Sequence, residues 1–313
     1  MTNKPKISIL MPTYNCDKYL EEALESLTKQ TFSDFELIII DDSSTDNSKN
    51  IALSYTIKDN RIKVIDNKYD KGVYGALNSG LDICTGDFIA RADGDDISKN
   101  DRLEKQIDFL NKHTNIDIIG SGFELFGNVK NKKIFHPSSS IELVWKFLTN
   151  TYFCHPSVMF RKSVLNTIQY YPSETSEDFA FFSKVIQKHR GSNLNEILVY
   201  YRQHGTNCSI LKEEKIKESI KNTFLKNFEF YTGSLSNSEI FYDFHYKRNI
   251  SFKNLPKITN ISYKISQKIL KEYSISKYNS QTLYLYFFIM INIVKSFLLQ
   301  YPRKIYKKYL NKK

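Results

Sequence analysis

Short apolar runs alternate with segments of helical periodicity over about the first 120 residues of this 313-residue chain. Each run is apolar at nearly every position, which is typical of parallel strands that helices cover on both faces. The expected strands are 6–11, 36–40, 62–65, 87–90 and 116–120. The expected helices are 17–29, 46–57, 72–82 and 101–113. This alternation predicts an α/β fold with a doubly wound, mostly parallel sheet.

Polar segments follow three of the expected strands. They are "PTYN" after the first strand, "DDSSTDNS" at the end of the second and "DGDD" after the fourth. In a doubly wound sheet, ligands bind beyond the carboxyl ends of the strands. We therefore expect these three segments to meet around one ligand.

The segment "DGDD" places three acids, Asp93, Asp95 and Asp96, within four positions. Two like charges about 4 Å apart repel by roughly 4 kcal/mol at an effective dielectric constant of 20, so the cluster needs a reason. Carboxylate oxygens suit Mg²⁺ or Mn²⁺, which often bind one or two carboxylates together with the phosphates of a substrate. Gly94 permits a bend that turns neighbouring carboxylates toward one ion. The alternative, capping of the next helix, accounts for one or two of the acids.

Other nucleotide and metal motifs do not match. The chain has no GxxxxGK[ST] segment, which excludes a P-loop. "GSGFEL" at 120–125 has Leu125 where a dinucleotide site needs a third glycine, and we place it at the exit of the fifth strand. An EF-hand over 93–104 fails at Ile97 and Ser98, where an oxygen ligand and a glycine are required. These observations leave a metal-diphosphate site at the strand ends.

Four segments occur in a recognisable order along residues 5–210. They are "ISILMPTYN", "QTFSDFELIIIDDSSTDNS", "GALNSGLDICTGDFIARADGDD" and "SEDFAFF". Together they resemble the family 2 glycosyltransferases with the GT-A fold. The resemblance implies a metal-dependent, inverting transfer of a sugar from a nucleotide donor, with Mn²⁺ or Mg²⁺ as the cofactor.

The resemblance also assigns roles at the nucleotide. Pro12, Thr13 and Tyr14 match the segment that lines the base and the ribose. Asp42 matches the acid that accepts the ring N–H of the base. Arg91 would help to balance the charge of the diphosphate, although an ordinary strand residue explains it equally well.

The remaining roles concern the metal and the reaction. Asp93 would lie near the ribose and the metal, and Asp95 would bind the metal directly. His204, in "YRQHGTN", would reach the metal or the diphosphate; its alternative is a turn histidine. Asp178, with Glu177 beside it, matches the catalytic base; the alternative is an acidic helix N-terminus. We interpret two further residues, His155 and Trp145, as core residues; the alternative is that they line the acceptor pocket.

The charge of the chain divides at about residue 210. Up to Ile210 there are 25 Lys and Arg against 27 Asp and Glu, and from Leu211 onward there are 20 against 7. We therefore predict a catalytic domain over 1–210 and a basic, Tyr-rich helical extension over 211–313. The near-neutral front part and the lack of an RNA-binding motif argue against a nucleic-acid partner.

The segment 283–299 is aromatic and apolar, and basic residues follow it. It is shorter than the roughly 20 apolar residues of a spanning helix. We predict a helix in the interface of an anionic membrane, with packing on the catalytic domain as the alternative. Widely spaced cysteines and an N-terminus without a secretory leader favour a cytoplasmic protein, peripheral on the inner face of the membrane.

These expectations combine into one functional hypothesis. A sugar such as glucose, galactose or an N-acetylhexosamine would pass from a UDP-sugar to a glycan or an undecaprenyl-diphosphate-linked acceptor. Enzymes of this resemblance commonly build O-antigen, capsule or related surface polysaccharides. The alternatives are a non-catalytic sugar-nucleotide-binding protein and a nucleotidyltransferase; the latter should have a glycine-rich basic loop after the first strand, where "MPTYNCDKYL" has none.

Overall fold

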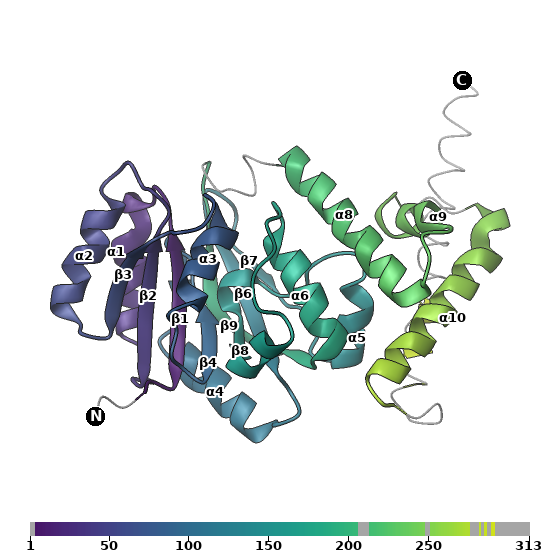
Figure 1. The fold of residues 1–313 in the computed structure, drawn as a ribbon, viewed down its shortest axis with the longest axis horizontal. Coiled ribbons are helices and arrows are strands. Elements are labelled where there is room, and N and C mark those ends of the chain that lie inside the picture. The colour runs from purple at the N-terminus through teal and green to yellow at the C-terminus, as the bar shows by residue number, and fades with distance from the viewer. Residues whose placement is uncertain are drawn as a thin grey trace.

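The computed structural model describes residues 4–205, 213–247 and 251–275, with positions 282, 285, 286 and 289–291 beyond them. Within this part, helices lie on both sides of one central sheet (Figure 1). All five predicted strands are present: β1 (Ile7–Thr13), β2 (Phe35–Asp41), β3 (Ile62–Asp66), β4 (Phe88–Arg91) and β6 (Ile118–Gly127). All four predicted helices are present as well: α1 (Asp17–Thr28), α2 (Ser48–Lys58), α3 (Val73–Leu81) and α4 (Arg102–Lys112).

The strand order explains where a ligand can bind. The described sheet runs β3-β2-β1-β4-β8-β6-β9-β5, and β1 pairs in parallel with both β2 and β4. The chain thus leaves β1 toward one edge of the sheet and returns to the other side of β1 at β4. Such a switch point opens a crevice at the carboxyl ends of the two strands. The structure confirms the predicted α/β fold with a mostly parallel, doubly wound sheet.

The region after residue 123 contains more strand than we predicted. β8 (Met159–Arg161) lies antiparallel between β4 and β6, in a segment for which we predicted no strand. Its three residues are too few for a recognisable pattern, and the strand exists because β4 and β6 flank it on both sides. β6 continues to Gly127, so "GSGFEL" lies inside a strand and not at its exit. The other strands after residue 123 are β7 (Lys132–Ile134) and β9 (Gly191–Gln203), and the short β5 (Ile97–Ser98) lies before α4.

The sheet separates two hydrophobic clusters. On one face, Ile9 and Ile39 pack with α1, α2 and α4. On the other face, Leu10 and Ile38 pack with α3, α5 (Ser140–Lys146) and α6 (Glu177–Lys188). Successive strand residues point to opposite faces, so two covered faces account for the uninterrupted apolar runs of the sequence.

The helices after residue 212 extend the second cluster. They are α8 (Glu213–Thr232), α9 (Ser238–Tyr242) and α10 (Leu255–Glu272). Phe224 and Phe228 of α8 are buried in the same cluster as Phe181 of α6. Trp145 is also buried there, 6.3 Å from the ring of Phe241, as expected for a core residue. The helical extension and the sheet therefore share one core.

Most of the predicted interfacial helix over 283–299 lies outside the described residues, as do the basic residues that follow it. Among its described positions, Leu285 and Ile289 are buried in the second cluster, and the ring of Tyr286 stacks on Tyr263. These contacts agree with the alternative, in which the segment packs on the rest of the protein. Contact with a membrane stays a prediction. No helix among the described residues has both the length and the apolar character to cross a membrane.

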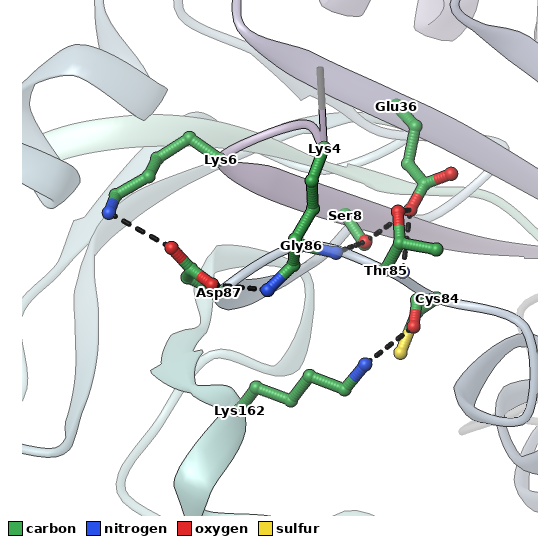
Figure 2. Close-up of polar contacts among 9 residues, drawn as sticks. All are labelled: Lys4, Lys6, Ser8, Glu36, Cys84, Thr85, Gly86, Asp87 and Lys162. Atoms are coloured by element: carbon green, nitrogen blue, oxygen red, sulfur yellow. Dashed lines mark hydrogen bonds and ion pairs between the residues drawn. The ribbon is translucent and has the colours of Figure 1, made fainter. Parts of the chain in front are cut away.

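Polar contacts hold the starts of the strands in place (Figure 2). They lie at the end of the sheet opposite to the acid cluster, which follows the end of β4. The buried carboxylate of Glu36 accepts hydrogen bonds from the hydroxyls of Ser8 and Thr85, both at 2.7 Å, and from the ammonium of Lys63 at 2.8 Å. Burial alone would raise the pKa of Glu36, but these donors together lower it to about 2. The ionised carboxylate therefore stabilises the fold.

We expect Glu36→Leu to lower the free energy of unfolding at pH 7 by about 1.5–3 kcal/mol, because it leaves buried donors without an acceptor. The depressed pKa means that this stabilisation is complete above about pH 4.5 and is lost as the pH falls toward 2. Urea unfolding between pH 7 and pH 3 measures both effects. Glu25→Leu, at an exposed position of α1, is the matched control and should change little. Equal losses in the two variants would contradict the assignment.

Candidate active site

The ends of β1 and β2 bring the predicted nucleotide-binding residues together. The N–H of Asp42 donates to the carbonyl of Thr13 at 2.9 Å, so Asp42 lies directly beside Pro12 and Thr13. Tyr14 follows β1 and is 46% exposed, and the ammonium of Lys71 lies 4.0 Å from its ring centroid. The structure thus places an exposed aromatic ring and a buried carboxylate at the same end of the sheet.

The carboxylate of Asp42 is fixed by the loop that precedes α3. It accepts the side-chain amide of Asn67 at 2.6 Å and the backbone N–H of Gly72 at 2.9 Å. Gly72 has a φ of 139°, a conformation that residues with a side chain rarely adopt. An ionised carboxylate offers about four lone-pair positions, so Asp42 retains capacity to accept another N–H.

The turn after β4 brings three carboxylates together. Ligand atoms of Asp93, Asp95 and Asp96 all lie within 4.8 Å of one another. The predicted bend at Gly94 is present as a turn, although the φ of this glycine is not positive. A Cβ at this position would lie 2.8 Å from the Sγ of Cys16. Glycine is thus present because the turn packs closely against the start of α1.

Two of these acids lie next to basic side chains. Asp93 pairs with the buried guanidinium of Arg91. One oxygen of Asp95 lies 2.9 Å from Nε2 of His204, at the end of β9. The structure therefore brings all three predicted metal ligands, Asp93, Asp95 and His204, to one place.

The donor set fits a divalent cation. Burial raises the pKa of Asp96, and the charges of Asp93 and Asp95 raise it further. One oxygen of Asp96 accepts the N–H of Arg202 at 2.8 Å, while its buried Oδ2 has no hydrogen-bond partner among the described residues. A buried acceptor without a donor, next to two more carboxylates, is suited to a hard cation such as Mg²⁺ or Mn²⁺.

Two arginines that we did not predict hold the acidic turn. Arg102 is fully buried and donates to the carbonyl of Arg91 at 2.6 Å and to the hydroxyl of Ser98 at 2.9 Å. Arg202 donates from Nε to the carbonyl of Asp95 at 2.8 Å. Arg202 lies in "YRQHGTN", so its segment was recognisable, whereas Arg102 looked like an ordinary first residue of a helix.

The predicted base, Asp178, lies in the first turn of α6. Burial raises the pKa of Asp178, while the charge of Arg91 lowers it and the charge of Asp93 raises it. Burial, followed by the charge of Asp178, raises the pKa of Glu177 to about 8. The Nδ1 of His155 lies 3.7 Å from Glu177, and burial keeps the pKa of this histidine well below its usual range. His155 is half-buried and lies beside Glu177, so both interpretations of this residue, core packing and lining of the acceptor pocket, stay open.

Comparisons with known proteins agree with this geometry. The sequence model described as Glycosyl transferase family 2 matches residues 8–169. The putative glycosyltransferase EpsE of Bacillus subtilis (strain 168) is 37% identical over 234 residues, which are 72% of this chain and 82% of that protein. The Escherichia coli protein named UDP-Glc:alpha-D-GlcNAc-diphosphoundecaprenol beta-1,3-glucosyltransferase WfgD is 31% identical over 225 residues, covering 71% of this chain and 87% of the relative.

Solved structures share the fold at low sequence identity. S. aureus TarS 1–349 in complex with UDP-GlcNAc has a TM-score of 0.63 and 19% identity, with 93% of this chain and 89% of that chain covered. The mannosyltransferase PcManGT from Pyrobaculum calidifontis, in complex with GDP-Man and Mn²⁺, has a TM-score of 0.58 and 13% identity, with 95% and 87% covered. These likenesses show the GT-A fold. The sequence model of the family matches about half of the chain. The protein belongs to glycosyl transferase family 2.

Proposed function

We propose that this family 2 enzyme transfers a sugar from a UDP-sugar to an acceptor hydroxyl with inversion at the anomeric carbon, with Mn²⁺ or Mg²⁺ as cofactor. The observation that carries the proposal is the cluster of Asp93, Asp95 and Asp96, whose ligand atoms lie within 4.8 Å at the switch point of the sheet. Two further observations support the proposal: the buried carboxylate of Asp42 lies at the ends of β1 and β2, and the half-buried carboxylate of Asp178 lies at the start of α6.

The donor would lie across the ends of β1, β2 and β4. Tyr14 and Asp42 would hold the base, with the carboxylate of Asp42 accepting its ring N–H. The diphosphate would face Asp93, Asp95 and His204, and Arg91 would balance part of the charge through its pair with Asp93. When bound, the divalent cation neutralises the negative charge that develops on the departing diphosphate.

Asp178 would act as the general base. As the acceptor oxygen forms its bond to the anomeric carbon, the bond from that carbon to the diphosphate oxygen breaks. The hydroxyl proton passes to the carboxylate of Asp178, whose raised pKa makes it a stronger base than an exposed aspartate. One base without a covalent nucleophile favours a single displacement, so an α-linked donor would give a β-linked product.

The acceptor class is proposed from the named relative. WfgD is named for a reaction on alpha-D-GlcNAc-diphosphoundecaprenol. A polyprenyl-diphosphate-linked sugar is therefore the acceptor that we propose, in surface-polysaccharide synthesis such as that of O-antigen or capsule. Its lipid would place the reaction at the cytoplasmic face of the membrane, where the basic C-terminal residues would contact anionic lipid.

Calorimetry with UDP, GDP and dTDP, each with and without Mn²⁺, tests the donor assignment. We expect UDP to bind at least about tenfold more tightly with Mn²⁺ than without, and more tightly than the other two nucleotides. UDP release from UDP-sugars, measured on the same sample, distinguishes an enzyme from a protein that only binds the donor. Failure of all three nucleotides to bind would contradict the proposal.

A further inference from the structure

A cavity of about 430 Å³ lies where α3, α6 and α8 begin. Volumes of roughly 300–1,000 Å³ are typical of small-molecule sites. Figure 1 shows α6 and α8 packed beside each other, with α3 nearer the sheet. The lining residues are Tyr74, Ser173, Glu174, Thr175, Lys215, Glu218 and Ser219.

One wall of this cavity leads directly to the proposed base. Residues 173–175 immediately precede Glu177 and Asp178 in the chain. Ser176 is tied to α8, because its N–H and its hydroxyl lie 3.2 and 2.7 Å from the hydroxyl of Ser219. The carboxylate of Glu174 also accepts a hydrogen bond from Thr223 of α8 at 3.0 Å. The wall is thus held in place by α8.

The opposite wall adjoins the proposed nucleotide site. Tyr74 lies in the first turn of α3, and a Cβ at Gly72 would lie 3.1 Å from its ring. The N–H of Gly72 is the group that holds Asp42. Asn78 of α3 bonds both the N–H and the carbonyl of Tyr171, at 2.8 and 3.0 Å, which joins the two walls. The lining therefore comes from the segment that precedes the proposed base and from the helix that follows the loop holding Asp42.

The lining favours an uncharged, hydroxyl-rich molecule. The ring of Tyr74 offers a flat surface for the C–H face of a sugar, and the hydroxyls of Ser173 and Thr175 can exchange hydrogen bonds with its hydroxyl groups. The carboxylate of Glu174 pairs with Lys226 of α8, which leaves the carboxylate of Glu218 and the ammonium of Lys215. The lining therefore carries no excess of positive charge to attract a diphosphate.

We propose that this cavity binds the neutral sugar ring of the acceptor, and that the diphosphate of a lipid-linked acceptor lies outside it. The inference rests on the proposed glycosyl transfer and adds the residues that select the acceptor. Tyr74 and Ser173 would determine which sugar is accepted without taking part in bond formation.

Saturation-transfer NMR on the full chain tests this with the methyl α-glycosides of glucose, galactose, N-acetylglucosamine and N-acetylgalactosamine, in the presence of UDP and Mn²⁺. We expect at least one glycoside to bind the wild type. Ser173→Trp, which fills the cavity from an exposed position, should reduce that signal at least fivefold. Ser236→Trp, at an exposed serine lining a different cavity, is the matched control and should leave it unchanged.

A second pair of variants separates binding from misfolding. Tyr74→Leu should lose the glycoside signal and Tyr74→Phe should retain it. Binding of UDP with Mn²⁺ is measured on every sample, so failure of the donor site is seen independently of the cavity. The inference is overturned by lack of binding of all four glycosides to the wild type, by an unchanged signal in Ser173→Trp, or by methyl diphosphate displacing the glycoside.

Discussion

Replacing Asp178 with Asn should reduce sugar transfer by about 10²–10⁴-fold and leave Mn²⁺-dependent UDP binding within about twofold of the wild type. The amide keeps the shape of the carboxylate but cannot take the proton of the acceptor hydroxyl. Asp178 lies at the start of α6, while the predicted donor contacts come from the ends of β1, β2 and β4. Loss of turnover without loss of donor binding is therefore the expected signature.

A pH profile of UDP release extends this test. The base must be ionised to act, and burial raises the pKa of Asp178. As the pH is lowered, wild-type activity should therefore be lost at a pH above about 3.9, the usual pKa of an aspartate. Asp108→Asn, at an exposed position of α4, is the matched control and should behave as the wild type. Transfer by Asp178→Asn within tenfold of the wild type would exclude Asp178 as the base.

Replacing Asp95 with Asn should weaken UDP binding in the presence of Mn²⁺ by about 10- to 100-fold or more. Mutating residues that only orient the ligands of a metal already costs about 10- to 100-fold in metal affinity, and losing a ligand should cost at least as much. Asp95 lies within 4.8 Å of the other two carboxylates and contacts His204, so its oxygen is central to the cluster. In EDTA the variant and the wild type should bind UDP equally weakly. Calorimetry measures both conditions, and an intact response of the variant to Mn²⁺ would argue against Asp95 as a ligand.

Much of the fold could be predicted because its signals are local. The runs at 6–11 and 36–40 are apolar on both faces, and the structure covers both faces with helices. β8 could not be predicted, because three residues carry no periodic pattern and pairing with β4 and β6 creates the strand. A strand defined by its neighbours is visible only once they are in place.

The site shows the same division between local and distant information. Asp93, Asp95 and Asp96 occur within four residues, so the sequence alone predicts their cluster. The burial of Arg102, and the oxygen of Asp96 that has no hydrogen-bond partner in the described part of the chain, depend on how separate elements pack around the turn.

The cavity beside α6 was missed for a related reason. Its walls come from α3, the loop before α6, and α8, which are far apart in the chain. No segment of the sequence carries a motif for it.

The central claim is that a divalent ion lies between the carboxylates of Asp93 and Asp95 and the phosphates of a bound nucleotide. Anomalous diffraction from a crystal of the full chain containing MnCl₂ and UDP tests this most directly. We predict a manganese peak in contact with Asp95 and with phosphate oxygens of UDP. Ordered UDP without manganese at these carboxylates would contradict the claim.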